Sequence, residues 1–306
     1  MWTRKIEICS TMIAIRIFEI SFPIFAIVAV GLFYARKFRP DMSLPIRLNM
    51  DVFIPCLLFS VLIERGEVSD LFGGLALAIT LVIMLSGLIA LLFSRLFHID
   101  PRSLCPPIMF ANAGNLGLPL VILSFGEAAF PAAIICFIVC SFFHITVGNY
   151  ILNKQANILK VFSSPLILAV LLALVLSVLK IDVPKTVLEP IRMLGNICVP
   201  LMLFALGVRL LDMKLSEWRT GMLAAFLAPV SGIAIVLAII PFIELTRLEQ
   251  GTLFLFGALP PAVMNYMFAE HYNQEPSKVA AMVLFGNAFS VVSIPIALVY
   301  ALPRFG

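Results

Sequence analysis

Two short stretches decide the fold: NAGNLGLPL at residues 112–120 and GALPPAVMNYMFAEHY at residues 257–272. Both lie inside long apolar segments, where a cluster of Asn, Gly and Pro is unusual. Proline lacks the backbone N–H that a continuous helix needs, and it disfavours helical geometry in the residue before it. Glycine weakens a helix further because it gains so much backbone freedom on unfolding. We therefore expect both segments to be helices that break near their middle.

The composition around these stretches is that of a membrane protein. Of the 306 residues, 62% are hydrophobic and 12% are charged, whereas a soluble domain is about 45–50% apolar and about 25% charged. The chain has 21 Lys and Arg against 17 Asp and Glu, and this small, scattered excess does not indicate nucleic-acid binding. These values exclude a water-soluble globular protein and predict a chain whose surroundings are the lipid bilayer.

Charged and polar clusters divide the chain into ten apolar segments, most of them near the roughly 20 residues that a membrane-spanning helix needs. Because lipid cannot satisfy free backbone groups, these segments should be helices, and the alternation typical of a membrane β-barrel is not seen. The predicted fold class is an all-α, multi-pass integral membrane protein. The expected spans are residues 18–36, 44–63, 70–97, 104–125, 127–150, 162–180, 186–211, 217–243, 248–270 and 277–301.

The chain also repeats itself. Arg47, Pro55, Leu58 and Phe59 recur as Arg192, Pro200, Leu203 and Phe204, at a constant offset of 145 residues. We therefore expect two five-helix repeats, residues 1–153 and residues 154–306, whose helices mix in the folded molecule. A unit with an odd number of spans places its second copy upside down in the membrane, which is the inverted-repeat architecture of many secondary transporters.

The two expected helix breaks occupy matching places in this repeat, because a shift of 145 residues carries 112–119 onto 257–264. Free backbone groups at bilayer depth are tolerated only where they line a cavity or are buried in protein. Matched breaks therefore predict a binding site near the middle of the membrane. Half-helix amino termini near Pro119 and Pro261 would carry partial positive charge and free N–H groups, which suit an anion. The alternative is that these residues form kinks or close-packing points, as Pro and Gly often do in membrane helices.

These stretches, together with LGNICVPLMLFALG at residues 194–207, resemble the auxin efflux carrier family, which includes bacterial carboxylate carriers and the PIN-type auxin exporters of plants. The resemblance implies a ten-helix, five-plus-five inverted repeat in which helices four and nine cross at the substrate site. It also implies an organic acid substrate, an elevator-like motion and a homodimer. The short connection at residues 153–160 lacks the long hydrophilic loop of the long plant carriers, which favours a microbial carrier.

The resemblance also identifies candidate substrate-binding residues. It implies that Asn112 and Asn115 in helix four and Asn265 in helix nine contact the substrate, and an uncharged amide has the donors and the acceptor to hold a carboxylate. The expected site also includes the residues of the breaks, Gly117, Pro119, Pro260 and Pro261. The alternative for the asparagines is hydrogen bonding between helices. No Lys or Arg falls at the expected crossing, which favours a monocarboxylate substrate.

Two titratable residues are candidates for coupling to an ion. Asp51 lies within the second expected span, where a charged carboxylate is costly and therefore often functional, so it could carry a proton or help to hold a sodium ion. Arg47, one turn earlier, could instead neutralise it as an i,i+4 pair. His144 in the fifth span could titrate near neutral pH, with packing as the alternative. We expect no metal site and no other cofactor, since the six cysteines include no C-x-x-C pair.

Together these features predict a secondary active transporter that moves a small organic acid anion across the cytoplasmic membrane. The alternative is a sodium-coupled organic anion symporter of the bile-acid symporter type, which sodium dependence of transport would reveal. Loops after odd-numbered helices carry 12 Lys and Arg against 9 on the opposite side, so the positive-inside rule places both termini outside. The spans lack the paired acids or the adjacent nucleophile and base that an intramembrane enzyme needs, so we predict no enzymatic activity.

Overall fold

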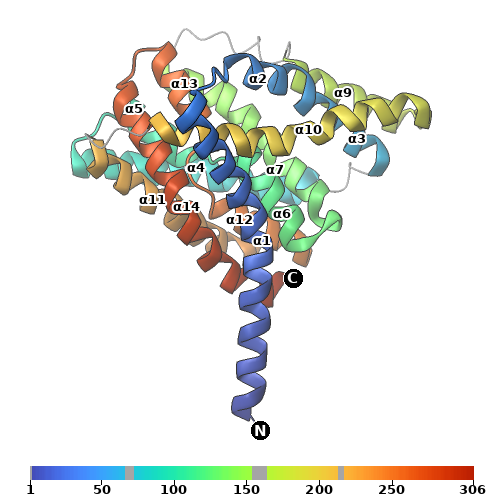
Figure 1. Cartoon of the computed structure of the whole chain (residues 1–306), viewed down its shortest axis with the longest axis horizontal. Coiled ribbons are helices and arrows are strands. Elements are labelled where there is room, and N and C mark those ends of the chain that lie inside the picture. Colours follow the sequence, from blue (N-terminus) through green and yellow to red (C-terminus); the bar gives the residue numbers. More distant parts are fainter. Residues whose placement is uncertain (1, 66–71, 154–163, 213–216) are drawn as a thin grey trace.

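The computed structural model describes residues 2–65, 72–153, 164–212 and 217–306, and in these ranges every regular element is a helix (Figure 1). The predicted all-α class is therefore confirmed. The predicted boundary between the two repeats, between residues 153 and 154, falls at the edge of a segment outside the described residues. The amino-terminal part of the first helix, α1 (Trp2–Phe38), projects away from the body of the molecule (Figure 1).

Seven helices in the described ranges are long and apolar enough to cross a membrane. Three occur in the first half of the chain before the first break: Ala14–Phe38 within α1, Ser43–Glu64 across α2 (Ser43–Leu48), η1 (Asn49–Phe53) and α3 (Ile54–Arg65), and Gly73–Phe97 within α4 (Phe72–Phe97). The fourth span, Glu127–Leu152, consists of η3 (Glu127–Ala129), α7 (Phe130–Phe143), η4 (His144–Gly148) and α8 (Asn149–Leu152). The fifth is α10 (Lys185–Arg209), and the sixth, Trp218–Phe242, consists of α11 (Trp218–Ile239) and η8 (Ile240–Phe242). The seventh is α14 (Pro276–Phe305).

The described residues of the three remaining predicted spans form short or interrupted helices. The span expected at 104–125 consists of α5 (Pro101–Met109), the π-helical η2 (Ala113–Gly117) and α6 (Leu118–Phe125). The span expected at 162–180 is α9 (Pro165–Val178), and the span expected at 248–270 consists of α12 (Arg247–Gly257) and α13 (Met264–His271). Both predicted breaks are therefore present, at residues 110–112 and 258–263.

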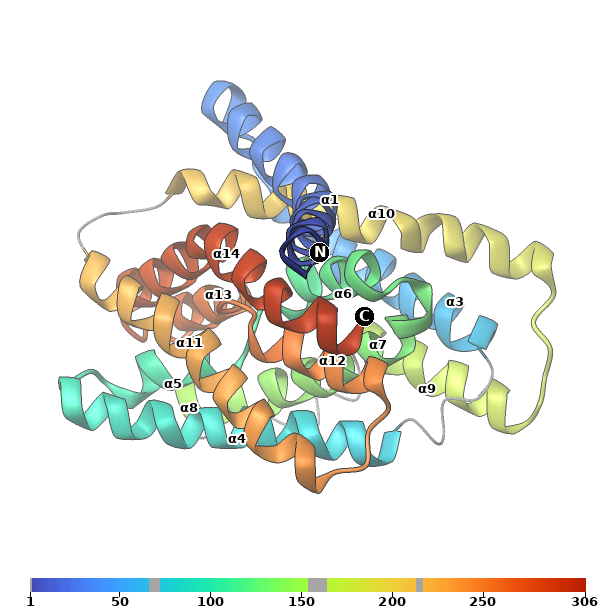
Figure 2. The ribbon, with the colours of Figure 1, turned by 90° about the horizontal axis from the view of Figure 1, so that it is seen from below.

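The helices pack in two groups. In the first group, α1 packs along α10, and α3 packs against both α9 and α10 (Figure 2). In the second group, α4 packs on α5 and α7, and α11 packs on α14 and α12. The broken helices thus belong to the second group, while η2 also contacts α10 of the first group.

The contact between α1 and α10 brings two helix backbones together. A Cβ atom added at Gly207 of α10 would overlap the carbonyl oxygen of Val28 in α1, and one added at Gly31 of α1 would overlap the carbonyl oxygen of Phe204 in α10. Small residues allow such close approach between membrane helices, where dispersion forces replace the hydrophobic effect as the main attraction. These two glycines therefore set the distance between α1 and α10.

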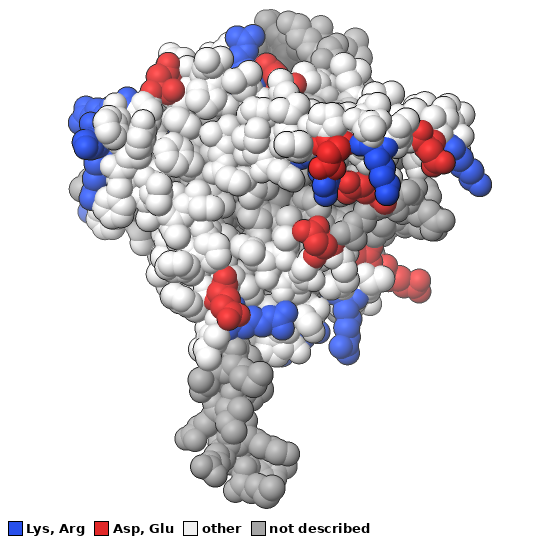
Figure 3. Space-filling view, turned by 45° about the vertical axis from the view of Figure 1, so that its right-hand side comes forward, with Lys and Arg blue, Asp and Glu red and all other residues white. Residues whose placement is uncertain are grey.

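The outer surface is suited to lipid. Large apolar side chains are exposed on several helices, including Phe18 on α1, Leu92 on α4 and Ile296 on α14. A broad uncharged area crosses the face seen in Figure 3, and the charged side chains gather mainly around its edges. An exposed apolar surface of this extent is unfavourable in water and favourable in a bilayer.

Candidate functional site at the crossing of the broken helices

The two broken helices cross and hydrogen-bond to each other at their breaks. The backbone N–H of Asn112 donates to the carbonyl oxygen of Pro260 at 2.7 Å, and that of Ala262 donates to the carbonyl oxygen of Phe110 at 2.9 Å. Residues Ala111 and Pro261 pair as an isolated antiparallel bridge. Each break therefore satisfies backbone groups of the other, which lowers the cost of placing extended backbone inside a membrane protein.

Two buried asparagines connect this crossing to α14. Asn112 Nδ2 donates to Asn287 Oδ1 at 2.7 Å, and Asn287 Nδ2 donates to the carbonyl oxygen of Pro261 at 2.9 Å. Both side chains are 3% exposed. Asn112 thus braces the crossing through Asn287, which was not among the residues predicted from the sequence.

Asn265 also braces the crossing. Its Nδ2 donates to the carbonyl oxygens of Phe110 and Ala262, both at 3.0 Å. The side chain is 1% exposed, and its Oδ1 has no hydrogen-bond partner. The described residues that line the adjacent cavity do not include Asn265, so the structure gives this predicted substrate contact a bridging position instead.

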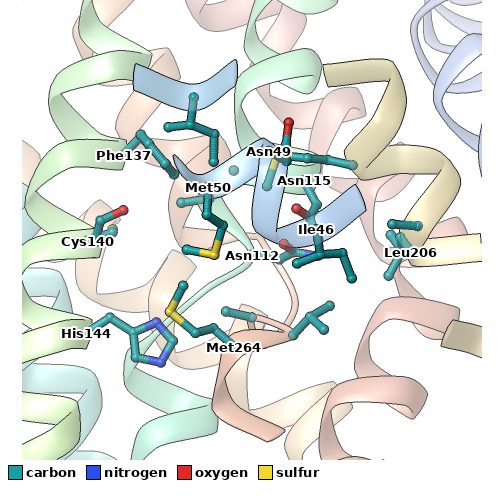
Figure 4. A pocket seen from close by; sticks show the side chains of 18 of the residues that line it. Ile46, Asn49, Met50, Asn112, Asn115, Phe137, Cys140, His144, Leu206 and Met264 are labelled. Carbon is teal, nitrogen blue, oxygen red and sulfur yellow. The ribbon is translucent and has the colours of Figure 1, made fainter. Parts of the chain in front are cut away.

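A cavity of about 120 Å³, here called the crossover cavity, lies beside the crossing (Figure 4). All three π-helical segments of the described chain contribute to its wall: Asn49 and Met50 from η1, Ala113, Gly114 and Asn115 from η2, and His144 and Ile145 from η4. In Figure 4 the labelled asparagines lie on one side, opposite Cys140 and His144. A π-helical turn inserts one extra residue into a helix and is frequent at functional sites.

Asn115 is the predicted residue best placed to meet a ligand. It lines the crossover cavity and is half-buried, and its side chain makes no hydrogen bond to the described residues. Asn49 is a second cavity amide, 3% exposed, with an Oδ1 that has no partner. The sequence carries a signal for Asn49, because it is an amide inside a predicted apolar span.

The structure does not bring four other predicted residues to the wall of this cavity. Gly117, Pro260 and Pro261 are buried at the crossing and are not among the described residues that line the cavity. Pro119 lines a different cavity of about 500 Å³, together with Glu64 and Arg192. The second half of helix four begins at Ala113 rather than near Pro119, because the extended residues come earlier in the chain than expected.

The two candidates for ion coupling occupy different environments. The Asp51 side chain is 50% exposed, and its Oδ2 lies 3.5 Å from Nε of Arg47. Asp51 is not among the described residues of the cavity wall. His144 is 5% exposed and lines the cavity. Its ring stacks on Phe110 with centroids 4.4 Å apart, and its Nε2 has no hydrogen-bond partner.

Arg209, the last residue of α10, also lines the crossover cavity. The expectation that no Lys or Arg lies at the crossing was therefore wrong. The reason is that the carboxyl end of α10 reaches the crossing from the other helix group, which the position of Arg209 at the end of a predicted span does not reveal.

We expect Asn287→Leu to destabilise the protein strongly. The change removes both hydrogen bonds that Asn287 exchanges with Asn112 and Pro261, and each buried polar group left unpaired costs about 1–3 kcal/mol. The melting temperature of the purified protein in detergent should fall, whereas Asn196→Leu, at an exposed position on α10, should leave it near the wild-type value. Equal melting temperatures for the two variants would contradict the bracing role of Asn287.

An all-helical, membrane-spanning chain whose two broken helices cross beside a cavity has the construction of a membrane transporter. The sequence profile of the family described as "Membrane transport protein" matches residues 16–298. The chain belongs to this family, and the predicted resemblance to the auxin efflux carriers is thereby confirmed. An uncharacterized transporter of Methanocaldococcus jannaschii is 25% identical to it over 266 residues, which cover 80% of this chain and 86% of that protein.

Proposed function

We propose that this membrane transport protein is a secondary active transporter for a small organic acid anion, and that the crossover cavity is its substrate site. The observation that carries the proposal is the Asn115 side chain, which lies in the cavity wall without a hydrogen-bond partner among the described residues. Amide donors at the amino-terminal end of a half-helix suit an anion. In the same proposal the protein resides in the cytoplasmic membrane with both termini outside.

We further propose that the fold is a ten-helix inverted repeat that works by an elevator motion. In such a repeat, helices one and two correspond to helices six and seven. The repeat would then relate the contact of α1 with α10 to the contact of α3 with α9. It would relate the contact of α4 with α7 to the contact of α11 with α14 in the same way. The first helix group would form the fixed, dimer-forming part, and the second group would carry the cavity across the membrane.

Transport by purified protein in lipid vesicles tests the proposal. Vesicles should take up one or more labelled acids from a panel of monocarboxylates, hydroxy acids and dicarboxylates, and unlabelled acid on the inside should accelerate the uptake by exchange. Separate pH and sodium gradients identify the driving ion, and uptake that requires sodium at constant pH would favour the symporter alternative. Absence of uptake and of exchange for the whole panel would contradict the proposed function.

Within this function we propose that His144 carries the coupling proton and that Asp51 does not. We expect His144→Gln to lose the acceleration of uptake by an imposed pH gradient while it keeps exchange of labelled for unlabelled acid, because exchange needs no net proton movement. Asp51→Asn is the matched comparison, and it should respond to the gradient like the wild type because Asp51 is half exposed and paired with Arg47. The reverse pattern in the two variants would assign coupling to Asp51.

A further inference from the structure

Arg209 lies at the boundary between two cavities. It forms part of the wall of the crossover cavity and also lines a neighbouring cavity of about 440 Å³, which contains Tyr266 and Glu270. The residues that line both cavities are Arg209 and Val263. A guanidinium at this boundary is positioned to meet a ligand on its way into the crossover cavity.

The guanidinium of Arg209 lacks a partner among the described residues. Its Nε is buried and makes no hydrogen bond, and none of the ion pairs between described side chains involves it. The acid of the neighbouring cavity, Glu270, instead accepts a hydrogen bond from the Tyr266 hydroxyl at 2.9 Å. The carboxyl end of α10 favours a cation, but that interaction leaves the buried Nε donor unsatisfied, and an unsatisfied buried donor is costly.

The rest of the crossover cavity offers no fixed negative charge. Its described lining residues include no Asp and no Glu, and Arg209 is the one Lys or Arg among them. Most of the others are apolar, such as Met50, Phe137 and Met264. Charge is weakly screened in such surroundings, so the cavity favours an anion.

We infer that Arg209 binds the carboxylate of the substrate and limits the site to one negative charge, an inference that rests on the proposed transport function. Guanidinium and carboxylate form paired, charge-assisted hydrogen bonds. One fixed cation compensates one anionic group, and a second carboxylate would remain buried without a counter-charge. The substrate class is a small monocarboxylate with a second polar group, such as a hydroxyl, that hydrogen-bonds to Asn115.

The size of the cavity agrees with this class. The cavity volume of about 120 Å³ is several times the roughly 10–15 Å³ that one water molecule needs, so a small organic molecule fits in it. Arg209 on α10 and Asn115 on η2 both lack a hydrogen-bond partner among the described residues. A ligand with two polar ends satisfies both side chains together. A site built to hydrogen-bond such a ligand rejects analogues that lack one of the groups.

Binding of matched ligands to the full-length protein in detergent tests this inference. The ligands are 2-hydroxy acids of three to six carbons, their neutral amides, and dicarboxylates of matching length. The wild type should bind a hydroxy acid more tightly than its amide and than the matching dicarboxylate. Arg209→Gln should weaken binding of the acid roughly 10- to 100-fold and weaken binding of the amide much less. Arg192→Gln, on the exposed side of the same helix, should behave as the wild type.

The outcomes separate this inference from the proposed function. If the wild type transports organic acids and Arg209→Gln keeps the preference of the wild type for acid over amide, the role of Arg209 is overturned while the function stands. Tighter binding of the dicarboxylate than of the hydroxy acid would overturn the one-charge limit. Absence of both binding and transport for every acid would instead contradict the proposed function. If Arg209→Gln does not fold, the order of acid, amide and dicarboxylate in the wild type still decides the charge limit.

Discussion

Substrate-dependent uptake by Asn115→Ala in lipid vesicles is expected to fall to the background of empty vesicles. The side chain lines the crossover cavity from η2 and has no partner among the described residues, so its donors and acceptor are free for a ligand. Loss of the amide leaves a polar group of the bound ligand buried without a partner, which costs about 1–3 kcal/mol, and it also removes an anchor that positions the substrate during movement. Because no bond of the fold depends on this side chain, the amount of folded protein should not change.

Asn196→Ala is the matched control for this variant. Asn196 is exposed on α10 and is not among the described residues of the cavity wall, so the substitution should preserve uptake. Initial rates over a range of substrate concentrations, normalised to the amount of protein in the vesicles, give the comparison. Undiminished uptake by Asn115→Ala would remove the assignment of the crossover cavity as the substrate site.

Gly207→Val should prevent formation of the native fold. The added side chain would overlap the carbonyl oxygen of Val28, and a backbone atom of a packed helix cannot move aside as a side chain can. The cost should exceed the roughly 1–3 kcal/mol of ordinary overpacking, because α1 and α10 would have to separate along their contact. We expect no monodisperse peak in size-exclusion chromatography of the solubilised variant.

The control for helix propensity is Gly73→Val, since a Cβ atom at Gly73 meets none of the described residues within 4 Å. This variant carries the same chemical change in a helix, so it should elute and melt close to the wild type. A Gly207→Val protein with the elution profile and melting temperature of the wild type would show that α1 and α10 do not depend on this close approach.

Local chemistry explains why the helix breaks could be predicted. The adjacent Pro260 and Pro261 remove two backbone donors in succession, and this effect does not depend on the rest of the fold. The bracing role of Asn287 could not be predicted in this way, because its partner Asn112 is 175 residues away in the chain. The π-helical turns η1, η2 and η4 likewise have no recognisable marker in the sequence.

Position within a span also proved a weak guide to environment. Asp51 and Asn49 lie two residues apart in η1, yet the Asp51 side chain is 50% exposed and Asn49 is 3% exposed. The rotation of a helix about its axis decides which of two such neighbours faces the interior. The apolar residues around Asn49 and Asp51 do not indicate that rotation, because both sides of the helix are apolar. The position of Arg209 in the cavity wall could not be predicted for a related reason, since residues at the end of a span are ordinarily assigned to the membrane surface.

The bridge between Ala111 and Pro261 has a consequence for how the chain tolerates changes in length. Its two backbone hydrogen bonds pair residues 110–112 with residues 260–262 in one register. A single-residue deletion in either segment shifts that register and leaves donors without acceptors, and no rotamer change can repair the loss. Variants of this protein that keep their function should therefore have no insertion or deletion in these two segments, or should have matching changes in both.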